Sequence, residues 1–251
     1  KVIAGVALVL IPTLMLFGLD YSKTQARESY GNIYASTELH GCDFMNDVCV
    51  VGEETAAQKV LLYGDSHIYQ LIPIFVDYTK THDVQITTCA LSCNGAQYSI
   101  IKDGTFNPGN FDLVINSFKT NSEELSREER LDLATTFSKF SKDRGAKHLI
   151  VLDNPFYAGS AAPRRIRLPE LEPLSRVDQD AVANPITQNW KDDTGEGTFF
   201  YDPFTVLCNS TECPLELDGK VLYLDNNHLS MVGVRLLEST LIDMVDQILG
   251  N

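Results

Sequence analysis

Short apolar segments of strand length alternate with longer amphipathic segments over most of this chain, and this alternation limits the fold more than any other feature. The expected strands lie at residues 60–63, 83–88, 112–118, 147–153 and 198–203. The expected helices span residues 67–80, 126–145 and 230–249. Such alternation is typical of a mostly parallel sheet with helices on both faces. We therefore expect an α/β fold, a three-layer α/β/α sandwich.

Capping residues support two of the expected helices. Ser126 precedes the second helix, with Glu129 three residues later, and Gly145 ends it. This is the pattern of a capping box followed by a glycine stop. Ser230 is the expected cap of the last helix, whose apolar residues recur at spacings of three and four.

The first residues form an apolar segment that is long enough to cross a bilayer. Residues 2–19 carry no charge. A secretory signal and a buried soluble helix are the alternative interpretations. The chain begins with Lys1 rather than methionine, and we interpret it as a fragment of a longer protein. We expect residues 1–20 to form a transmembrane helix and residues 21–57 to form an extracytoplasmic linker.

The six cysteines fall into three pairs that are close in sequence: Cys42 and Cys49, Cys89 and Cys93, and Cys208 and Cys213. Beside an export-type apolar segment, this pattern favours three local disulfides in an oxidising compartment. Reduced cysteines in a cytosolic protein are the alternative. The spacings are not those of a zinc site, and no histidine lies at ligand spacing, so we expect no metal.

The charge of the chain limits its partners. Its formal net charge is −14, which argues against nucleic acid or anionic lipid as a direct electrostatic partner. Residues 154–191 fit neither a strand nor a helix period, and they include the basic "PRRIR" cluster in this acidic chain. Such a segment is either a functional lid or rim, or a poorly ordered excursion.

The sequence Gly-Asp-Ser-His at residues 64–67 follows the first expected strand directly. Ligands bind at the carboxyl ends of the strands in an open parallel sheet, so Ser66 is a candidate nucleophile. The backbone N–H of Ser66 or His67, at the positive end of the next helix, could receive an oxyanion. A serine between a strand and a helix is also ordinary N-cap chemistry, and this remains the alternative.

A second polar motif, "DNNHLS" at residues 225–230, precedes the last helix. The three-residue spacing lets Asp225 orient the imidazole of His228 while the other ring nitrogen faces a hydroxyl. A serine needs such a base, because its hydroxyl is a poor nucleophile until its proton is removed. A hydrogen-bonded histidine at a helix start is the alternative. Together with Ser66, the motif favours a serine triad.

Gly-Asp-Ser-His after the first strand and Asp-x-x-His-Leu-Ser before the last helix resemble the SGNH (GDSL-like) hydrolase superfamily, over about residues 58–251. The apolar segment, the first cysteine pair and "DGKVLYLDNNHLS" make the chain similar to the SGNH domains fused to acyltransferase-three membrane proteins. Those proteins O-acetylate bacterial surface glycans. The resemblance implies a flavodoxin-like sheet at residues 58–251, and residues 1–20 as the last span of a missing membrane domain.

The resemblance also implies roles for individual residues. Ser66 would be the nucleophile, His228 the general base and Asp225 the residue that orients it. The superfamily adds a glycine and a Gly-x-Asn-Asp motif for the oxyanion hole. Gly95 and Asn121 are the candidates here beside Ser66, with Asn116 possible in another register. His40, His67, His82 and His148 are expected on surfaces or in turns, with His67 a candidate for substrate contact.

The resemblance implies an O-acetyltransferase domain that forms an acyl-serine intermediate and transfers the acetyl group to a sugar hydroxyl of lipopolysaccharide O-antigen or a similar glycan. The donor would be acetyl-CoA, acting through the missing inner-membrane domain, and the catalytic domain would lie in the periplasm. The chain has no phosphate-binding glycine loop, so we expect no coenzyme to bind to it directly. A membrane-anchored carbohydrate esterase and a non-catalytic glycan-binding module are the alternatives.

Overall fold

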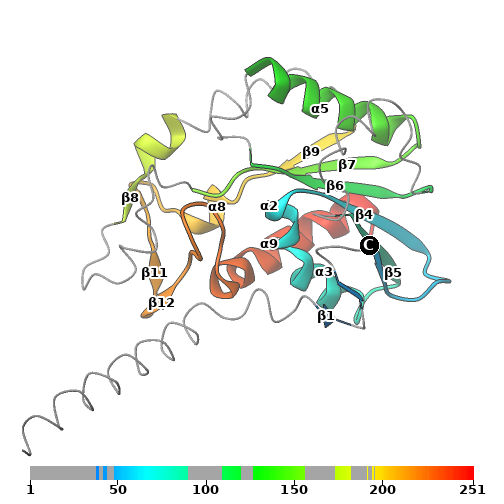
Figure 1. The fold of residues 1–251 in the computed structure, drawn as a ribbon, viewed down its shortest axis with the longest axis horizontal. Helices are drawn as coiled ribbons and strands as arrows, with labels where there is room; N and C mark the ends of the chain where they lie inside the picture. The colour runs from blue at the N-terminus through cyan, green and yellow to red at the C-terminus, as the bar shows by residue number, and fades with distance from the viewer. Residues whose placement is uncertain are drawn as a thin grey trace, which may run out of the picture.

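The computed structural model describes residues 38–39, 42–43, 48–89, 109–119, 127–155, 173–181, 191, 194 and 196–251 of the chain. A six-stranded sheet lies at the centre of this part (Figure 1). Its strands in spatial order are β3 (Cys49–Val51), β5 (Val84–Cys89), β4 (Gln58–Gly64), β6 (Leu113–Ser117), β7 (Lys147–Val151) and β9 (Thr198–Tyr201).

The sheet is parallel except at one edge. The edge strand β3 runs antiparallel to β5, and every other neighbouring pair is parallel, which confirms the predicted mostly parallel sheet. The parallel strands follow the order β5-β4-β6-β7-β9. This is the 2-1-3-4-5 order of flavodoxin-like sheets. In such a sheet the connections leave β4 and β6 toward opposite sides, so that a crevice forms at the carboxyl ends of these two strands.

Helices cover both faces of the sheet, as predicted (Figure 1). The helix on one face is α5 (Arg127–Lys142), and the helices on the other are α2 (Ser66–Tyr69), α3 (Ile72–Tyr78) and α9 (Met231–Leu249). Alternate residues of β4 serve the two faces: Leu62 packs into the cluster on the α9 side, whereas Leu61 and Tyr63 pack into the cluster on the α5 side. The alternation is the period-two pattern that places successive strand residues on opposite faces.

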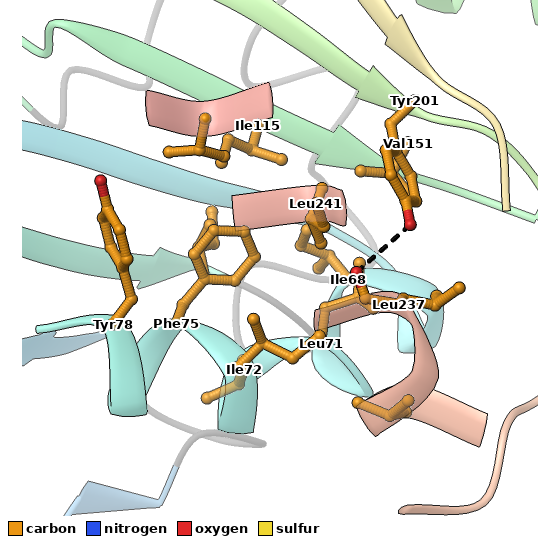
Figure 2. Close-up of a cluster of buried hydrophobic side chains, with 14 of the residues drawn as sticks. Ile68, Leu71, Ile72, Phe75, Tyr78, Ile115, Val151, Tyr201, Leu237 and Leu241 are labelled. Atoms are coloured by element: carbon orange, nitrogen blue, oxygen red, sulfur yellow. Dashed lines mark hydrogen bonds between the residues drawn. The ribbon is translucent and has the colours of Figure 1, made fainter. Parts of the chain in front are cut away.

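The larger core lies between the sheet and the pair α3 and α9. Leu237 and Leu241 of α9 are fully buried, and Figure 2 shows them among the side chains of α2 and α3. Burial of each such side chain stabilises the fold by about 1.5–3 kcal/mol. The hydroxyl of Tyr201 donates a hydrogen bond to the Leu237 carbonyl over 3.3 Å, which ties β9 to α9.

The last helix begins and ends as the sequence predicts. The Ser230 hydroxyl accepts a hydrogen bond from the Gly233 N–H, so Ser230 is the N-cap of α9. Gly250 adopts a left-handed conformation (φ 85°) and ends the helix. Ser126, the predicted cap of α5, lies outside the described residues.

The helix predicted at residues 67–80 is divided into α2 and α3. Pro73 lies in the first turn of α3 and has no N–H to donate to the carbonyl four residues earlier, with which its ring would also clash. The proline therefore prevents a continuous helix. As a result, Gln70 and Leu71 lie at the junction between the two helices.

Several short elements lie outside the main sheet. They are β1 (Glu38–Leu39), β2 (Cys42–Asp43), β8 (Leu174–Ser175), α8 (Phe204–Leu207), β10 (Glu212–Cys213), β11 (Glu216–Leu217) and β12 (Lys220–Val221). The strands pair as β1 with β2, β8 with β10, and β11 with β12, all antiparallel. Strand β8 belongs to the irregular segment at residues 154–191, so part of that segment is attached to the domain through β10.

The predicted linker at residues 21–57 needs one correction. Its Cys49–Val51 portion is strand β3, which pairs with β5 at the edge of the central sheet. Cys49 and Val51 are buried and Val50 is exposed, which is the alternation expected of an edge strand. The sheet thus begins before residue 58. The predicted transmembrane segment at residues 2–19 lies outside the described residues, and within the described part no helix is both long and apolar enough to cross a membrane.

His148 was predicted on a surface or in a turn, and this prediction is wrong. The residue lies within β7 and is 1% exposed. Its Nε2 hydrogen-bonds to the side-chain oxygen of Asn116, whose amide donates to the Tyr63 carbonyl over 3.1 Å. Burial, with the nearby charge of Lys142, lowers the pKa of His148 to about 3. The neutral imidazole is therefore part of the packing between three adjacent strands.

Burial of neutral His148 should make the protein less stable in acid. The unfolded chain binds a proton at this residue below its ordinary pKa of about 6.5, whereas the folded chain binds it only near pH 3. The free energy of unfolding should therefore fall by roughly 1.4 kcal/mol for each pH unit below about 6. Urea unfolding of the wild type and of His148→Gln, which retains a donor for Asn116, measures the effect. An equal pH dependence in both proteins would contradict it.

Candidate active site

Ser66 lies at the carboxyl ends of β4 and β6, where sheets of this order bind their ligands. Gly64 ends β4 and pairs with Ser117 at the end of β6. A Cβ atom on Gly64 would lie 2.0 Å from the Ser117 carbonyl oxygen, so the two strands can approach this closely only with glycine at this position. The chain then turns at Asp65, and Ser66 is the first residue of α2.

Asp65 fixes the turn that carries Ser66. One carboxylate oxygen accepts the His67 N–H over 2.8 Å, which caps α2, and the other accepts the Lys119 N–H over 2.9 Å. Lys119 follows β6, so Asp65 joins the segments that leave β4 and β6. These bonds are charge-assisted and stronger than neutral hydrogen bonds. The predicted N-cap role thus belongs to Asp65, and the side chain of Ser66 is left available for another partner.

Ser66, His228 and Asp225 are brought together in one hydrogen-bonded chain. The Ser66 Oγ lies 2.6 Å from His228 Nε2, and the His228 Nδ1 lies 2.6 Å from an Asp225 carboxylate oxygen. The other oxygen of Asp225 accepts the backbone N–H groups of Asn227 and His228 over 2.9 and 2.8 Å. The serine and the histidine are 162 residues apart in the sequence, so only the fold places them in contact.

The carboxylate of Asp225 stays ionised over the whole physiological range. Burial tends to raise its pKa, but the hydrogen bonds from the side chain of His228 and from the backbone of Asn227 and His228 outweigh burial and lower the pKa to about 2. An ionised carboxylate only accepts hydrogen bonds, so His228 Nδ1 carries the proton toward it. His228 Nε2 is then the acceptor for the Ser66 hydroxyl, which is the arrangement a general base requires.

His67 was expected on a surface or in a turn with possible substrate contact, and it is instead buried, with 1% exposure. Its Nδ1 lies 3.3 Å from Asp65 and its Nε2 lies 4.0 Å from Asp153. Burial tends to lower the pKa of His67, but the hydrogen bond to Asp65 and the charges of both carboxylates raise it. The His67 ring lies 5.1 Å from the ring of His228. His67 is therefore buried beside His228 and does not lie on a surface.

Two buried amide side chains hold the loop that carries His228. The Gln70 side-chain oxygen accepts the Leu229 N–H over 2.8 Å, and the Asn154 amide donates to the Asn227 carbonyl over 3.1 Å. Neither residue belongs to a motif that marks it as functional in the sequence. A signal existed for Asn154, because it follows the strand at residues 147–151, where polar residues meet at the ligand-binding edge of a parallel sheet. No comparable signal marked Gln70.

The residues proposed for the oxyanion hole are only partly placed. Gly95 and Asn121 lie outside the described residues. Asn116 is 2% exposed, and both ends of its side-chain amide are used within the sheet, by Tyr63 and His148. Its proposed role as a donor is therefore wrong. The N–H of Ser66 remains a candidate, because the first N–H groups of a helix have no acceptor within the helix.

The disulfide pattern follows the prediction where the structure describes it. Cys208 and Cys213 form a disulfide across five residues. Cys49 and Cys89 are each disulfide-bonded as well. Their predicted partners, Cys42 and Cys93, lie outside the residues whose side chains are described. Within the described part of the chain, no cluster of three or more His, Cys, Asp or Glu side chains is arranged to hold a metal ion.

The chain matches a protein-family model over more than half of its length. The model of the "SGNH domain (fused to AT3 domains)" matches residues 92–243, a range that includes Asp225 and His228 and begins after Ser66. No curated protein sequence matches the chain.

Comparison with solved structures gives several matches. A protein described as an SGNH hydrolase, from Slackia heliotrinireducens, has a TM-score of 0.50 at 15% identity and covers 75% of this chain and 99% of its own. The salicylyl-acyltransferase SsfX3 of a tetracycline biosynthetic pathway has a TM-score of 0.46 at 15% identity, covering 78% of this chain and 56% of its own. The α/β hydrolase LAE5, from the metagenome of Lake Arreo, has a TM-score of 0.44 at 10% identity, covering 78% and 96%. The first likeness supports the fold alone.

Proposed function

This chain belongs to the family of SGNH domains fused to AT3 domains, and from that premise we propose that it is the serine-dependent O-acetyltransferase domain of a membrane protein that acetylates a bacterial surface glycan. The family supports hydrolase or acyl-transfer chemistry. The observation that carries the proposal is that His228 bridges Ser66 and Asp225 through two hydrogen bonds of 2.6 Å. The glycan, such as a lipopolysaccharide O-antigen, is the proposed acceptor.

The proposed reaction has two halves that use the same base. In the first, His228 Nε2 removes the proton of Ser66 as its Oγ attacks the acetyl carbonyl carbon. The bond to the donor's leaving atom breaks, that atom takes the proton from His228, and acetyl-Ser66 remains. In the second, a sugar hydroxyl gives its proton to His228 and attacks the acetyl group. The bond to Ser66 then breaks, and the Ser66 oxygen regains the proton.

The acetyl donor is proposed to come through the AT3 domain, which the family description names as the fusion partner. Acetyl-CoA is the proposed ultimate source of the acetyl group, and this domain is proposed to bind no coenzyme itself. We place the domain on the periplasmic side of the inner membrane. The disulfide between Cys208 and Cys213 supports an oxidising compartment, where such bonds persist.

A membrane-anchored esterase is the second candidate, and one observation favours it. The side chains of His228 and Asp225 are 25% and 37% exposed, so water can reach the residues that would activate it. Transfer and hydrolysis share the acetyl-Ser66 intermediate and differ only in the acceptor. Exclusion of water and positioning of the sugar decide between them.

A partition experiment tests the proposed function. The protein is incubated with 4-nitrophenyl acetate as donor, with and without a bacterial O-polysaccharide, and both free acetate and acetylated polysaccharide are quantified. If transfer is the native reaction, the polysaccharide should divert most of the acetyl groups from acetate to sugar at an unchanged rate of nitrophenol release. Release of acetate that the polysaccharide does not alter would favour the esterase.

A further inference from the structure

The loop at residues 225–229 carries both Asp225 and His228 but belongs to neither a helix nor a strand. Two contacts close to the loop fix its shape. The Leu224 N–H donates a hydrogen bond to the His228 carbonyl over 2.8 Å, and Tyr223 forms an isolated antiparallel β-bridge with Leu229. These bonds lie within the loop and its flanks. They do not set the position of the loop relative to α2, and that position determines the distance between Ser66 and His228.

Gln70 connects the loop to α2. Its side-chain oxygen accepts the N–H of Leu229, the residue directly after His228, over 2.8 Å. Its backbone N–H donates to the carbonyl of Ser66 over 3.2 Å. A single residue therefore bonds to the main chain of the serine and to the neighbour of the histidine. Gln70 and Leu229 are 3% and 0% exposed, so water does not compete for this bond.

We infer that Gln70 is a positioning residue for the proposed reaction. By binding both the Ser66 carbonyl and the Leu229 N–H, it fixes the distance between Ser66 Oγ and His228 Nε2. The inference rests on the proposed function. Its physical basis is that proton transfer is efficient only within hydrogen-bond reach, and that a misplacement of about 1 Å costs on the order of 100-fold in rate. The break before Pro73 leaves Gln70 at the end of α2, facing the loop.

Two substitutions of nearly equal size separate the hydrogen bond from packing. Gln70→Met removes the acceptor for the Leu229 N–H, whereas Gln70→Glu retains an acceptor at the same reach. We expect Gln70→Met to lower kcat for release of nitrophenol about 30- to 100-fold, with KM within about twofold of wild type. Gln70→Glu should retain at least about tenfold more activity than Gln70→Met, because it can still bind the loop.

A matched control measures the effect of losing a buried hydrogen bond elsewhere. Ser138 lies on α5, its side chain is 3% exposed, and its hydroxyl donates to the Thr194 carbonyl over 3.0 Å. Ser138→Ala should lower the thermal midpoint to a similar extent as Gln70→Met and leave kcat unchanged. Loss of kcat in both variants in proportion to the thermal midpoint would overturn the inference, because Gln70 would then be only a structural residue.

Ser66→Ala, measured in the same assay, separates failure of the inference from failure of the proposed function. An inactive Ser66→Ala beside a Gln70→Met variant with the kcat of wild type would overturn the role of Gln70 alone. A fully active Ser66→Ala would overturn the proposed function, and the role of Gln70 with it. The fluorophosphonate labelling rate of Ser66 gives a second readout, which should fall in Gln70→Met and stay unchanged in Ser138→Ala.

Discussion

Replacement of Ser66 by alanine should lower the rate of nitrophenol release from 4-nitrophenyl acetate by at least about 10³-fold. Alanine removes the only atom that would form the acyl intermediate, Ser66 Oγ, and His228 Nε2 loses its 2.6 Å partner. The fold should survive, because the cap of α2 is the Asp65 carboxylate and not the Ser66 hydroxyl. Steady-state kinetics measure the loss, and mass spectrometry of the quenched reaction should find the acetyl group on Ser66 of the wild type.

Ser138→Ala is the matched control, because it also removes one hydrogen-bonded serine hydroxyl but lies on α5. It should keep the rate of the wild type. If Ser66→Ala keeps that rate too, Ser66 is simply the first residue of a helix, and the glycan-binding module becomes the better interpretation of the fold. A circular dichroism spectrum equal to that of the wild type would exclude misfolding as the cause of an inactive Ser66→Ala.

Asp225→Asn should lower kcat by about 10²- to 10⁴-fold with little change in size at the site. The asparagine amide can donate to His228 Nδ1, which would move the ring proton to Nε2 and leave no acceptor for the Ser66 hydroxyl. The substitution also removes the negative charge that would stabilise the imidazolium during proton transfer. Measurement of kcat and KM should show the loss in kcat, because the substitution changes no group proposed to bind the acceptor.

Asp246→Asn is the matched control for Asp225→Asn. Asp246 accepts a hydrogen bond of 2.5 Å from the Tyr78 hydroxyl, so its loss tests removal of a bonded carboxylate away from the site. This variant should keep the kcat of the wild type.

Since the pKa of Asp225 is lowered to about 2, its carboxylate stays ionised as the pH falls to about 3. A wild-type decline in kcat between pH 7 and 4 that persists unchanged in Asp225→Asn therefore belongs to another group.

Several parts of the fold could be predicted because they depend on local patterns. The strands at β4, β5, β6, β7 and β9 follow from apolar segments of strand length, and α9 follows from its periodicity and the cap at Ser230. The division between α2 and α3 was also readable in principle, since Pro73 cannot continue a helix. It was missed because the apolar period runs unbroken across the proline.

The short edge strand β3 and the buried histidines could not be predicted in this way. A three-residue strand carries too little periodicity to stand out from a linker, and it forms because β5 offers it an unpaired edge. A histidine looks alike in sequence whether it is exposed, bonded to Asn116 as His148 is, or placed beside Asp65 and Asp153 as His67 is. Its environment comes from residues distant in the sequence.

The candidate site also has features that the sequence indicated and features that only the fold decided. The sequence by itself determined which groups are chemically suited to act: a serine after a strand, and an aspartate three residues before a histidine at a helix start. The short spacing let Asp225 and His228 meet through one turn of the chain. Only the tertiary structure decided that His228 reaches Ser66 and that Gln70 and Asn154 hold the loop between them. Those contacts join segments that meet because parallel strands bring their carboxyl ends to one edge of the sheet, and side-chain packing sets their distances.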